Sequence, residues 1–386
     1  MRNIPQDERF CKTSGLKENN FIDFIDLLNK SDFWPTHRAF AQKIALKLSQ
    51  LAHKSETNER KNFIKRGERM AACAYHLGVE FCPDCGKYHV KRAQLCRDRA
   101  CPTCGALRAA KLATKTAARM EASAGRFLHV MLTVPNCADG ELKQNIRALS
   151  EGYTKLMKHK RLRGVVGGYV RTLEVTRPED TLDPSRPWHP HLHAIWRVED
   201  SYFDSPLYIY HEELLRLWNV IMGTAGKKPD GSEDLIKVCW IKPCDSEGRD
   251  KRAGAYEICQ YVTRFKCVYN LTLEQFREWL GALKGARLWT AGGCLRVDES
   301  EVEINSCELE EPAAETPKDS LCDECGSHLQ YADVAATGDG GAYKMLHFLI
   351  DWDARKKYNK LKHRRDREEA RQLAEIRKKR SVPNDN

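Results

Sequence analysis

The 386-residue sequence lacks the long apolar segments of a membrane protein. No run of about 18 apolar residues occurs, which excludes an ordinary transmembrane helix. The first residues also lack the apolar core of a secretory signal peptide, because charges stand at Arg2, Asp7, Glu8 and Arg9. No internal repeat of fixed period is present, which excludes a repeat architecture. We therefore expect a cytoplasmic protein with no membrane partner.

Composition indicates a globular protein, and its net charge suits a polyanionic partner without establishing one. Hydrophobic residues make up 41% of the chain, and its length predicts one large domain with smaller appendages. The formal net charge of +10 is unevenly distributed. Residues 344–380 hold 14 Lys and Arg against 6 Asp and Glu, whereas residues 298–319 hold 9 acidic residues and one Lys. The acidic stretch is interpreted as a linker, and the basic stretch as a long helix that is either simply solvated or in contact with DNA.

The order of predicted elements is typical of an α+β protein. Residues 1–75 carry apolar positions at helical spacing, and the Ala-rich and Lys-rich stretch 106–124 predicts another helix. Three apolar or alternating runs predict strands at 127–135, 168–176 and 191–198. The remaining predicted elements are helices at 141–160, 211–222 and 254–265 and a short strand near 236–241.

Sixteen cysteines in a cytoplasmic chain indicate metal binding rather than a disulfide framework. Two cysteines separated by two residues can reach one zinc ion from a single tight turn. Cys82 with Cys85 and Cys101 with Cys104 have this spacing, and together they predict one structural zinc site. Cys96 is an alternative ligand in that site, and His89 is a weaker one.

A second half-site is predicted at Cys322 and Cys325, but the sequence does not identify its partner ligands. Three residues could complete it: Cys294, Cys307 and His328. The other cysteines lie in apolar or helical surroundings and are interpreted as small core residues, among them Cys73, Cys239, Cys259 and Cys267.

Two histidines alternate along a predicted buried strand. The strand period of two places His191 and His193 on one face, where two imidazoles can chelate one divalent ion. An apolar strand makes unsatisfied polar rings costly, which favours a ligand role over a structural one. Glu174, in a neighbouring predicted strand, is either the third ligand or a solvent-facing residue. His189 has the same parity but precedes Pro190, so it is placed around the site rather than in it.

The segment from residue 254 to 265 carries a candidate nucleophile. Glu257 and Tyr261 stand four residues apart and therefore share one face of the predicted helix. A tyrosine needs a polarised phosphate or a nearby base to act as a nucleophile, and Glu257 is a candidate base. A plain helix surface would give the same spacing, and Tyr256 and Tyr269 are competing candidates.

Taken together, these motifs resemble the HUH endonucleases, in particular the rolling-circle plasmid replication initiators with a single catalytic tyrosine and a glutamate four residues before it. Leu132–Asn136 looks like the first family motif, His189–His193 like the metal-binding motif, and Tyr256–Arg264 like the catalytic motif. Cys96–Cys104 and Ala282–Leu288 also look like this branch. The resemblance covers about residues 80–295.

The resemblance implies a central antiparallel sheet flanked by helices, an RRM-like palm, with the two-histidine strand in the middle. It implies that Tyr261 attacks a phosphorus at a plasmid double-strand origin, forming a 5′-phosphotyrosine link and freeing a 3′-OH primer. The metal at His191 and His193 would be Mg²⁺ or Mn²⁺, and Glu257 would activate water at termination. Arg264 stands where the family commonly has Lys, which leaves a specific lysine role open.

The same resemblance implies single-stranded or cruciform DNA, a host helicase and a single-strand-binding protein as partners in a bacterial host. Arg264, Lys266 and Arg287 are the candidate DNA-binding residues. We expect five segments: an N-terminal helical region (1–79), a zinc-binding segment with its helix (80–125), the endonuclease core (126–295), an acidic linker (296–320), and a cysteine knuckle with a basic C-terminal helix (321–386).

Two alternatives remain open from the sequence. An HUH transposase or mobilisation relaxase would use the same chemistry at a mobile-element end. A zinc-knuckle DNA-binding regulator without catalysis would leave the histidine and tyrosine motifs as coincidence, and a metal-dependent hydrolase of small molecules is disfavoured further.

Overall fold

A computed structural model describes residues 26–31, 33–177, 185–224, 236, 239–244, 251–260, 266–304, 321–337 and 342–349. Within these ranges no helix is both long and apolar enough to cross a membrane. The chain divides into two compact units. One contains residues 37–73 and 95–306, and the other contains 74–94 together with the described residues before 37 and after 306.

A five-stranded sheet is the centre of the larger unit. Its strand order is β6-β3-β5-β4-β7, and all neighbours are antiparallel. The strands are β3 (Arg126–Thr133), β4 (Gly168–Thr176), β5 (His189–Val198), β6 (Cys239–Pro243) and β7 (Trp289–Gly293). β5 is the middle strand. Eight of its ten residues are buried and the other two, His189 and Arg197, are half-buried, so both faces of the sheet are covered.

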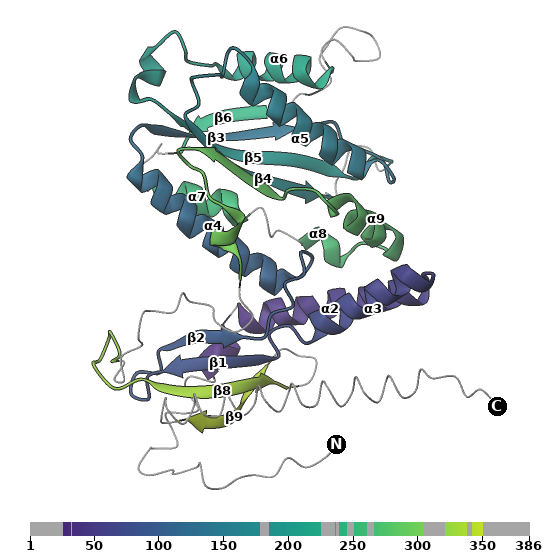
Figure 1. Cartoon of the computed structure of the whole chain (residues 1–386), viewed down its shortest axis with the longest axis vertical. Helices are drawn as coiled ribbons and strands as arrows, with labels where there is room; N and C mark the ends of the chain where they lie inside the picture. Colours follow the sequence, from purple (N-terminus) through teal and green to yellow (C-terminus); the bar gives the residue numbers. More distant parts are fainter. Residues whose placement is uncertain are drawn as a thin grey trace, which may run out of the picture. The chain divides into compact units, whose positions relative to one another are not determined.

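Helices cover both faces of this sheet (Figure 1). α4 (Pro102–Ala122) and α7 (Lys251–Gln260) lie on one face, where Met120, Phe127, Ile195 and Ile258 form a buried cluster. α5 (Leu142–Lys158) and α6 (His211–Met222) lie on the other. There the Trp196 indole N–H donates to the hydroxyl of Tyr153 on α5 at 3.0 Å. The alternation of strand side chains thus gives two different packing layers.

The remaining helices of the larger unit are α2 (Trp34–His53), which begins just before it, α3 (Thr57–Ala71), α8 (Lys266–Tyr269) and α9 (Leu273–Leu283). Two short 3-10 helices, η2 (Asp200–Asp204) and η5 (Glu299–Val302), also belong to this unit. α9 begins at a capping box in which Thr272 and Gln275 satisfy each other's backbone N–H groups. A side-chain cap of this kind fixes where the helix starts.

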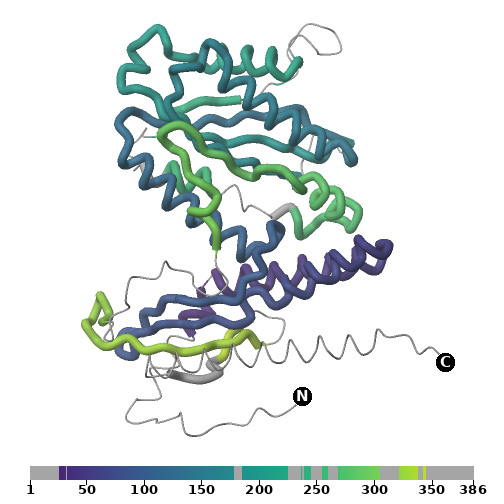
Figure 2. Tube along the Cα trace, in the orientation of Figure 1, coloured from purple at the N-terminus to yellow at the C-terminus, as the bar shows by residue number. Residues whose placement is uncertain are grey.

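A four-stranded antiparallel sheet forms the smaller unit, with strand order β2-β1-β8-β9. Its strands are β1 (His76–Phe81), β2 (Tyr88–Ala93), β8 (Gln330–Ala336) and β9 (Tyr343–Leu349). β1 and β8 lie side by side although they are far apart in the sequence (Figure 2). Arg92 of β2 and Asp333 of β8 form an ion pair at 2.7 Å, which ties the strands on either side of β1 together.

The α+β class with antiparallel sheets and flanking helices is confirmed. The predicted strands at 127–135, 168–176 and 191–198 correspond to β3, β4 and β5. The long basic helix expected from residue 344 does not begin there, because Tyr343–Leu349 pair with β8 as a strand. Residues 350–380 of that expected helix lie outside the described residues. The four-stranded sheet itself was not predicted.

Candidate metal centre and cysteine groups

Strand register brings the predicted metal ligands together. His191 and His193 alternate along β5 and share one face of the sheet. In the antiparallel pairing of β4 with β5, Glu174 stands directly opposite His191, and Thr172 stands opposite His193. Directly opposed residues have closely spaced Cβ atoms, so one carboxylate on β4 can reach both rings.

The geometry of these three side chains fits a single metal ion. Glu174 Oε2 lies 2.9 Å from His191 Nε2 and 3.3 Å from His193 Nε2. Ligand atoms about 2.1 Å from one ion, at angles from a right angle to the tetrahedral angle, lie about 3.0 to 3.4 Å apart. All three side chains are buried. Two imidazoles and one carboxylate leave coordination positions for a further ligand, as an open site requires.

Neighbouring groups orient the two rings. The Nδ1–H of His191 donates to the backbone carbonyl of His189 at 3.2 Å, which leaves Nε2 as the ligand atom. On His193, Nδ1 is joined to Nε2 of His129 by a hydrogen bond of 3.3 Å. His129 lies on β3, and burial lowers its pKa to about 3. Its ring is therefore neutral near pH 7.

The electrostatics of the site favour an ionised carboxylate. Burial alone would raise the pKa of Glu174, but the adjacent rings of His191 and His193 outweigh it and lower that pKa to about 2. A carboxylate charged at neutral pH and held between two imidazoles is the ligand state that a divalent cation requires.

Helix α7 places Glu257, one of the two candidate catalytic residues, near this face of the sheet. The Thr172 hydroxyl donates to the backbone carbonyl of Ile258 at 3.2 Å, which fixes α7 against β4. One residue before, Glu257 Oε1 lies 4.0 Å from His129 Nδ1. Tyr261 and Arg264 lie outside the described residues. The last described residue of α7 is Gln260, directly before Tyr261 in the chain.

The two competing tyrosines each contact another helix of the larger unit. Tyr256 on α7 has its hydroxyl 3.5 Å from that of Thr114 on α4. The ring of Tyr269 stacks on Phe40, with 4.2 Å between the ring centroids.

Sequence reasoning overlooked His129 and the partner of His189. Asn136, within the first motif, has its Oδ1 2.7 Å from His189 Nδ1. A signal for His129 was available: it has the same strand parity as Phe127, and a histidine in an otherwise apolar strand needs a polar partner. Its position opposite His193 depends on the register of β3 with β5, which one sequence does not supply.

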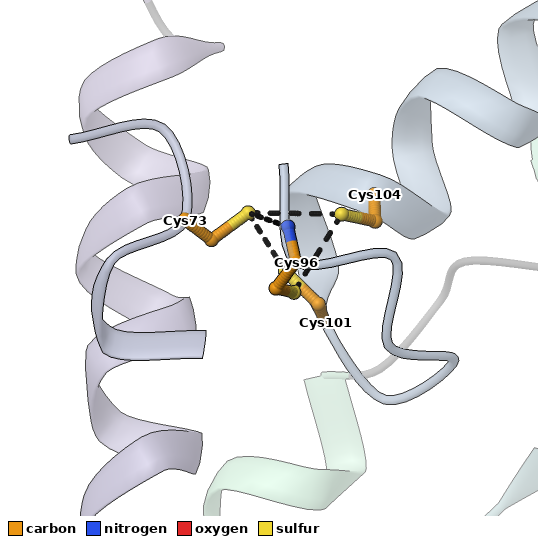
Figure 3. Close-up of side chains that lie close together, drawn as sticks. All are labelled: Cys73, Cys96, Cys101 and Cys104. Atoms are coloured by element: carbon orange, nitrogen blue, oxygen red, sulfur yellow. Dashed lines mark hydrogen bonds between the residues drawn. The ribbon is translucent and has the colours of Figure 1, made fainter. Parts of the chain in front are cut away.

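Four cysteines meet in the larger unit (Figure 3): Cys73, Cys96, Cys101 and Cys104. All four are buried, and the sulfur of Cys73 lies 3.6 Å from those of Cys101 and Cys104. Four sulfurs about 2.3 Å from one zinc ion at tetrahedral angles lie about 3.8 Å apart. Hydrogen bonds from Cys101, Cys73 and Cys96 lower the pKa of Cys104 below its usual range. This arrangement fits a closed metal site.

The elements around this group explain why the thiols converge. Cys73 follows α3, Cys101 directly precedes α4, and Cys104 lies in the first turn of α4. The backbone N–H of Arg97 donates to the Cys104 sulfur at 3.2 Å. Backbone N–H groups and a helix N-terminus both stabilise a thiolate.

A second group forms in the smaller unit from two matching turns: Cys82, Cys85, Cys322 and Cys325. In each turn the glycine after the second cysteine donates its N–H to the first cysteine's carbonyl, at 3.0 Å for Gly86 and 2.9 Å for Gly326. Both glycines have positive φ, 75° and 73°, a conformation that other residues rarely adopt. Pairing of β1 with β8 brings the two turns together, because one turn follows β1 and the other precedes β8.

The cysteines are therefore paired differently from the expected set of Cys82, Cys85, Cys101 and Cys104. The structure separates the two Cys-x2-Cys pairs into different groups, because strand β2 lies between them in the chain. Cys96 joins the group of Cys101 and Cys104, as the alternative had it, whereas Cys73 was interpreted as a core residue. Neither His89 nor Cys294 nor His328 belongs to these groups, and Cys307 is not described.

Two further expected DNA-binding residues, Lys266 and Arg287, lie in other elements of the larger unit. Lys266 is the first residue of α8, and Arg287 is exposed in the loop between α9 and β7. The structure therefore defines an α+β protein whose five-stranded sheet carries a candidate catalytic metal site of two histidines and one carboxylate. Its two cysteine groups are candidate structural metal sites.

Comparison with known proteins agrees with this description. A family model described as "Replication protein" matches residues 87–333, more than half of the chain. The chain belongs to this replication protein family. No solved structure matches it.

Curated relatives carry the name "Protein rep". One from Bacillus amyloliquefaciens is 32% identical over 164 residues, which are 41% of this chain and 46% of the relative. One from Lactiplantibacillus plantarum is 30% identical over 236 residues, which are 57% of this chain and 71% of the relative. The chain spans about half the length of the first curated relatives that it matches.

Proposed function

We propose that this protein is a plasmid rolling-circle replication initiator of the HUH endonuclease type. It nicks one DNA strand at a double-strand origin through Tyr261 and leaves a 3′-OH primer. The observation that carries the proposal is the buried centre of His191, His193 and Glu174, which lies on the same sheet face as α7. Membership in the replication protein family favours this function over a transposase or relaxase, and over a non-catalytic regulator.

The proposed roles follow from chemistry and position. His191, His193 and Glu174 hold Mg²⁺ or Mn²⁺, which when bound polarises a phosphate oxygen. Tyr261 forms a bond to phosphorus as the phosphorus–oxygen bond to the 3′ oxygen breaks, and its own proton is lost to a base or to water. The exposed fraction of the Glu257 side chain, 38%, leaves it accessible to water, which suits a later role in deprotonating the water that releases the 5′ end. Arg264 and Lys266 are proposed to neutralise phosphate charge.

Zinc is the proposed occupant of both cysteine groups. Each group brings four cysteine sulfurs close together, and four thiolates are a ligand set that suits zinc. Zinc has no redox chemistry of its own in such sites. We also propose a cytoplasmic location in a bacterial host, DNA in single-stranded or cruciform form as substrate, and a host helicase and single-strand-binding protein as partners.

A nicking assay with matched tyrosine variants tests the function. Purified protein is incubated with supercoiled plasmid bearing its cognate origin and with Mn²⁺ or Mg²⁺. We expect metal-dependent nicking that Tyr261→Phe abolishes and that Tyr256→Phe leaves intact, because the Tyr256 hydroxyl is engaged with α4. Loss of nicking in Tyr256→Phe with full activity in Tyr261→Phe would refute the assignment. Absence of nicking by the unaltered protein on that origin would favour a DNA-binding regulator.

A further inference from the structure

A basic pocket lies on the face of the sheet opposite the metal centre. It has a volume of about 660 Å³ and is bounded by α5, by β4 and β7, and by the loop after α9. Alternation along β4 decides the face: the Thr172 hydroxyl reaches α7, whereas the guanidinium of Arg171 lies 5.6 Å from the ring centroid of Tyr153 on α5. The pocket is therefore separated from the histidine centre by the sheet itself.

Arg171 is a buried charge in the pocket wall. Its side chain is only 5% exposed, and among the described residues its Nη1 has no hydrogen-bond partner. The cation–π contact with Tyr153 offsets part of the desolvation of the guanidinium, but it satisfies no N–H group. A buried charge without a counterion is strongly unfavourable, and arginine cannot escape by losing its proton. An anion in the pocket would remove this penalty.

The rest of the lining has the same sign. It contributes five further basic side chains and one acidic one: Lys143, Arg147, Lys158, Lys284, Arg287 and Glu151. Glu151 is occupied by Arg147, one helical turn away, at 2.7 Å. The pocket thus presents an excess of positive charge around Arg171, as phosphate recognition requires.

Size and aromatic lining favour a nucleotide over a bare inorganic anion. Pockets for small organic ligands have volumes of about 300 to 1,000 Å³, and the volume here falls in that range. The half-buried ring of Tyr169 also lines the pocket, and aromatic rings are the surfaces on which bases stack. An acidic peptide would use the basic residues but would gain nothing comparable from this ring.

We propose that this pocket binds a nucleotide, with its phosphate at Arg171 and its base against Tyr169. The nucleotide belongs either to a DNA strand or to the free pool, and both sources present the same phosphate ester. A DNA strand bound here would be held on the sheet face opposite the nicking centre. If the ligand is such a strand, the inference rests on the proposed function. Nucleotide binding itself needs neither nicking nor the metal.

The test uses the full chain without added divalent metal, so that no cleavage occurs. Binding of fluorescein-labelled oligothymidylate is measured by anisotropy, and binding of dTMP by calorimetry. Lys143→Ala with Lys284→Ala removes two exposed pocket charges, and Lys155→Ala on the same helix is the control outside the lining. Arg171→Met removes the buried charge at similar size.

We expect the double lysine variant and Arg171→Met each to weaken binding at least about fivefold, and Lys155→Ala to have a smaller effect. In the double variant the slope of log K for oligothymidylate against log salt concentration should be shallower by about 1.4. A loss confined to oligothymidylate identifies a strand, and a loss confined to dTMP identifies a free nucleotide. If Arg171→Met does not fold, the lysine variant decides. Unchanged binding of both probes overturns the proposal, as does equal competition by an oligoglutamate of the same charge.

A cross-linking experiment tests whether the oligonucleotide binds in the pocket or on the histidine face of the sheet. Oligothymidylate carrying 5-iododeoxyuridine is cross-linked to the protein by light, and the modified peptides are mapped. We expect adducts at Tyr169 that Lys143→Ala with Lys284→Ala reduces. Adducts found only on peptides of β5 or α7 would contradict a second binding site while leaving the nicking function untouched.

Discussion

Replacing Cys73 by alanine distinguishes a zinc ligand from a small core residue. Cys73 is completely buried, and its sulfur lies 3.6 Å from two other cysteine sulfurs. As a core residue it would contribute about 1 kcal/mol through its sulfur, comparable to one buried methylene and the space that it leaves. As a ligand it supports a metal site whose binding energy is part of the folding energy, so its loss costs on the order of 3 kcal/mol or more.

The assay combines zinc content with urea unfolding of the purified protein. We expect two zinc ions per unaltered chain and one per Cys73→Ala chain, together with the larger loss in the free energy of unfolding. Cys259→Ala is the control, because Cys259 is equally buried but belongs to neither cysteine group. It should retain both ions and lose only about 1 kcal/mol. The reasoning fails if Cys73→Ala retains two ions and unfolds like the control.

Three further predictions concern the other groups. Glu174→Gln should raise the Kd for Mn²⁺ at least about tenfold in a calorimetric titration and depress nicking accordingly, since a neutral amide replaces a charged ligand; unchanged affinity would exclude Glu174 as a ligand. Cys322→Ala should lower zinc content by one ion and expose β8 to limited proteolysis while nicking persists; two retained ions would contradict the second site. Glu257→Gln should leave the first nick nearly unchanged but slow release of the 5′ end at least about tenfold in single-turnover experiments; equal slowing of both steps would contradict a role in water activation.

Much of the larger unit could be predicted because its signals are local. The apolar runs that became β3, β4 and β5 and the helical periodicity of α5 and α6 are visible in short windows. The shared face of His191 and His193 follows from the strand period alone. The class of fold and the family were therefore accessible from the sequence.

What could not be predicted depends on contacts between distant segments. The cysteine pairing is set by β1 lying beside β8, and nothing local to Cys82 or Cys322 encodes that pairing. Tyr343–Leu349 became a strand for the same reason, since the available edge of β8 outweighed the helical pattern expected there. His129 reaches His193 only through the register of β3 with β5.

The central claim is that Tyr261 becomes covalently linked to DNA at a metal centre formed by His191, His193 and Glu174. The most direct measurement is tandem mass spectrometry of the protein after reaction with an origin oligonucleotide and Mn²⁺, followed by nuclease trimming of the attached strand. We predict a nucleotide 5′-phosphate on Tyr261 that is absent without metal and absent in His191→Ala. A phosphate adduct on Tyr256 or Tyr269, or one that forms equally in His191→Ala, would contradict the account.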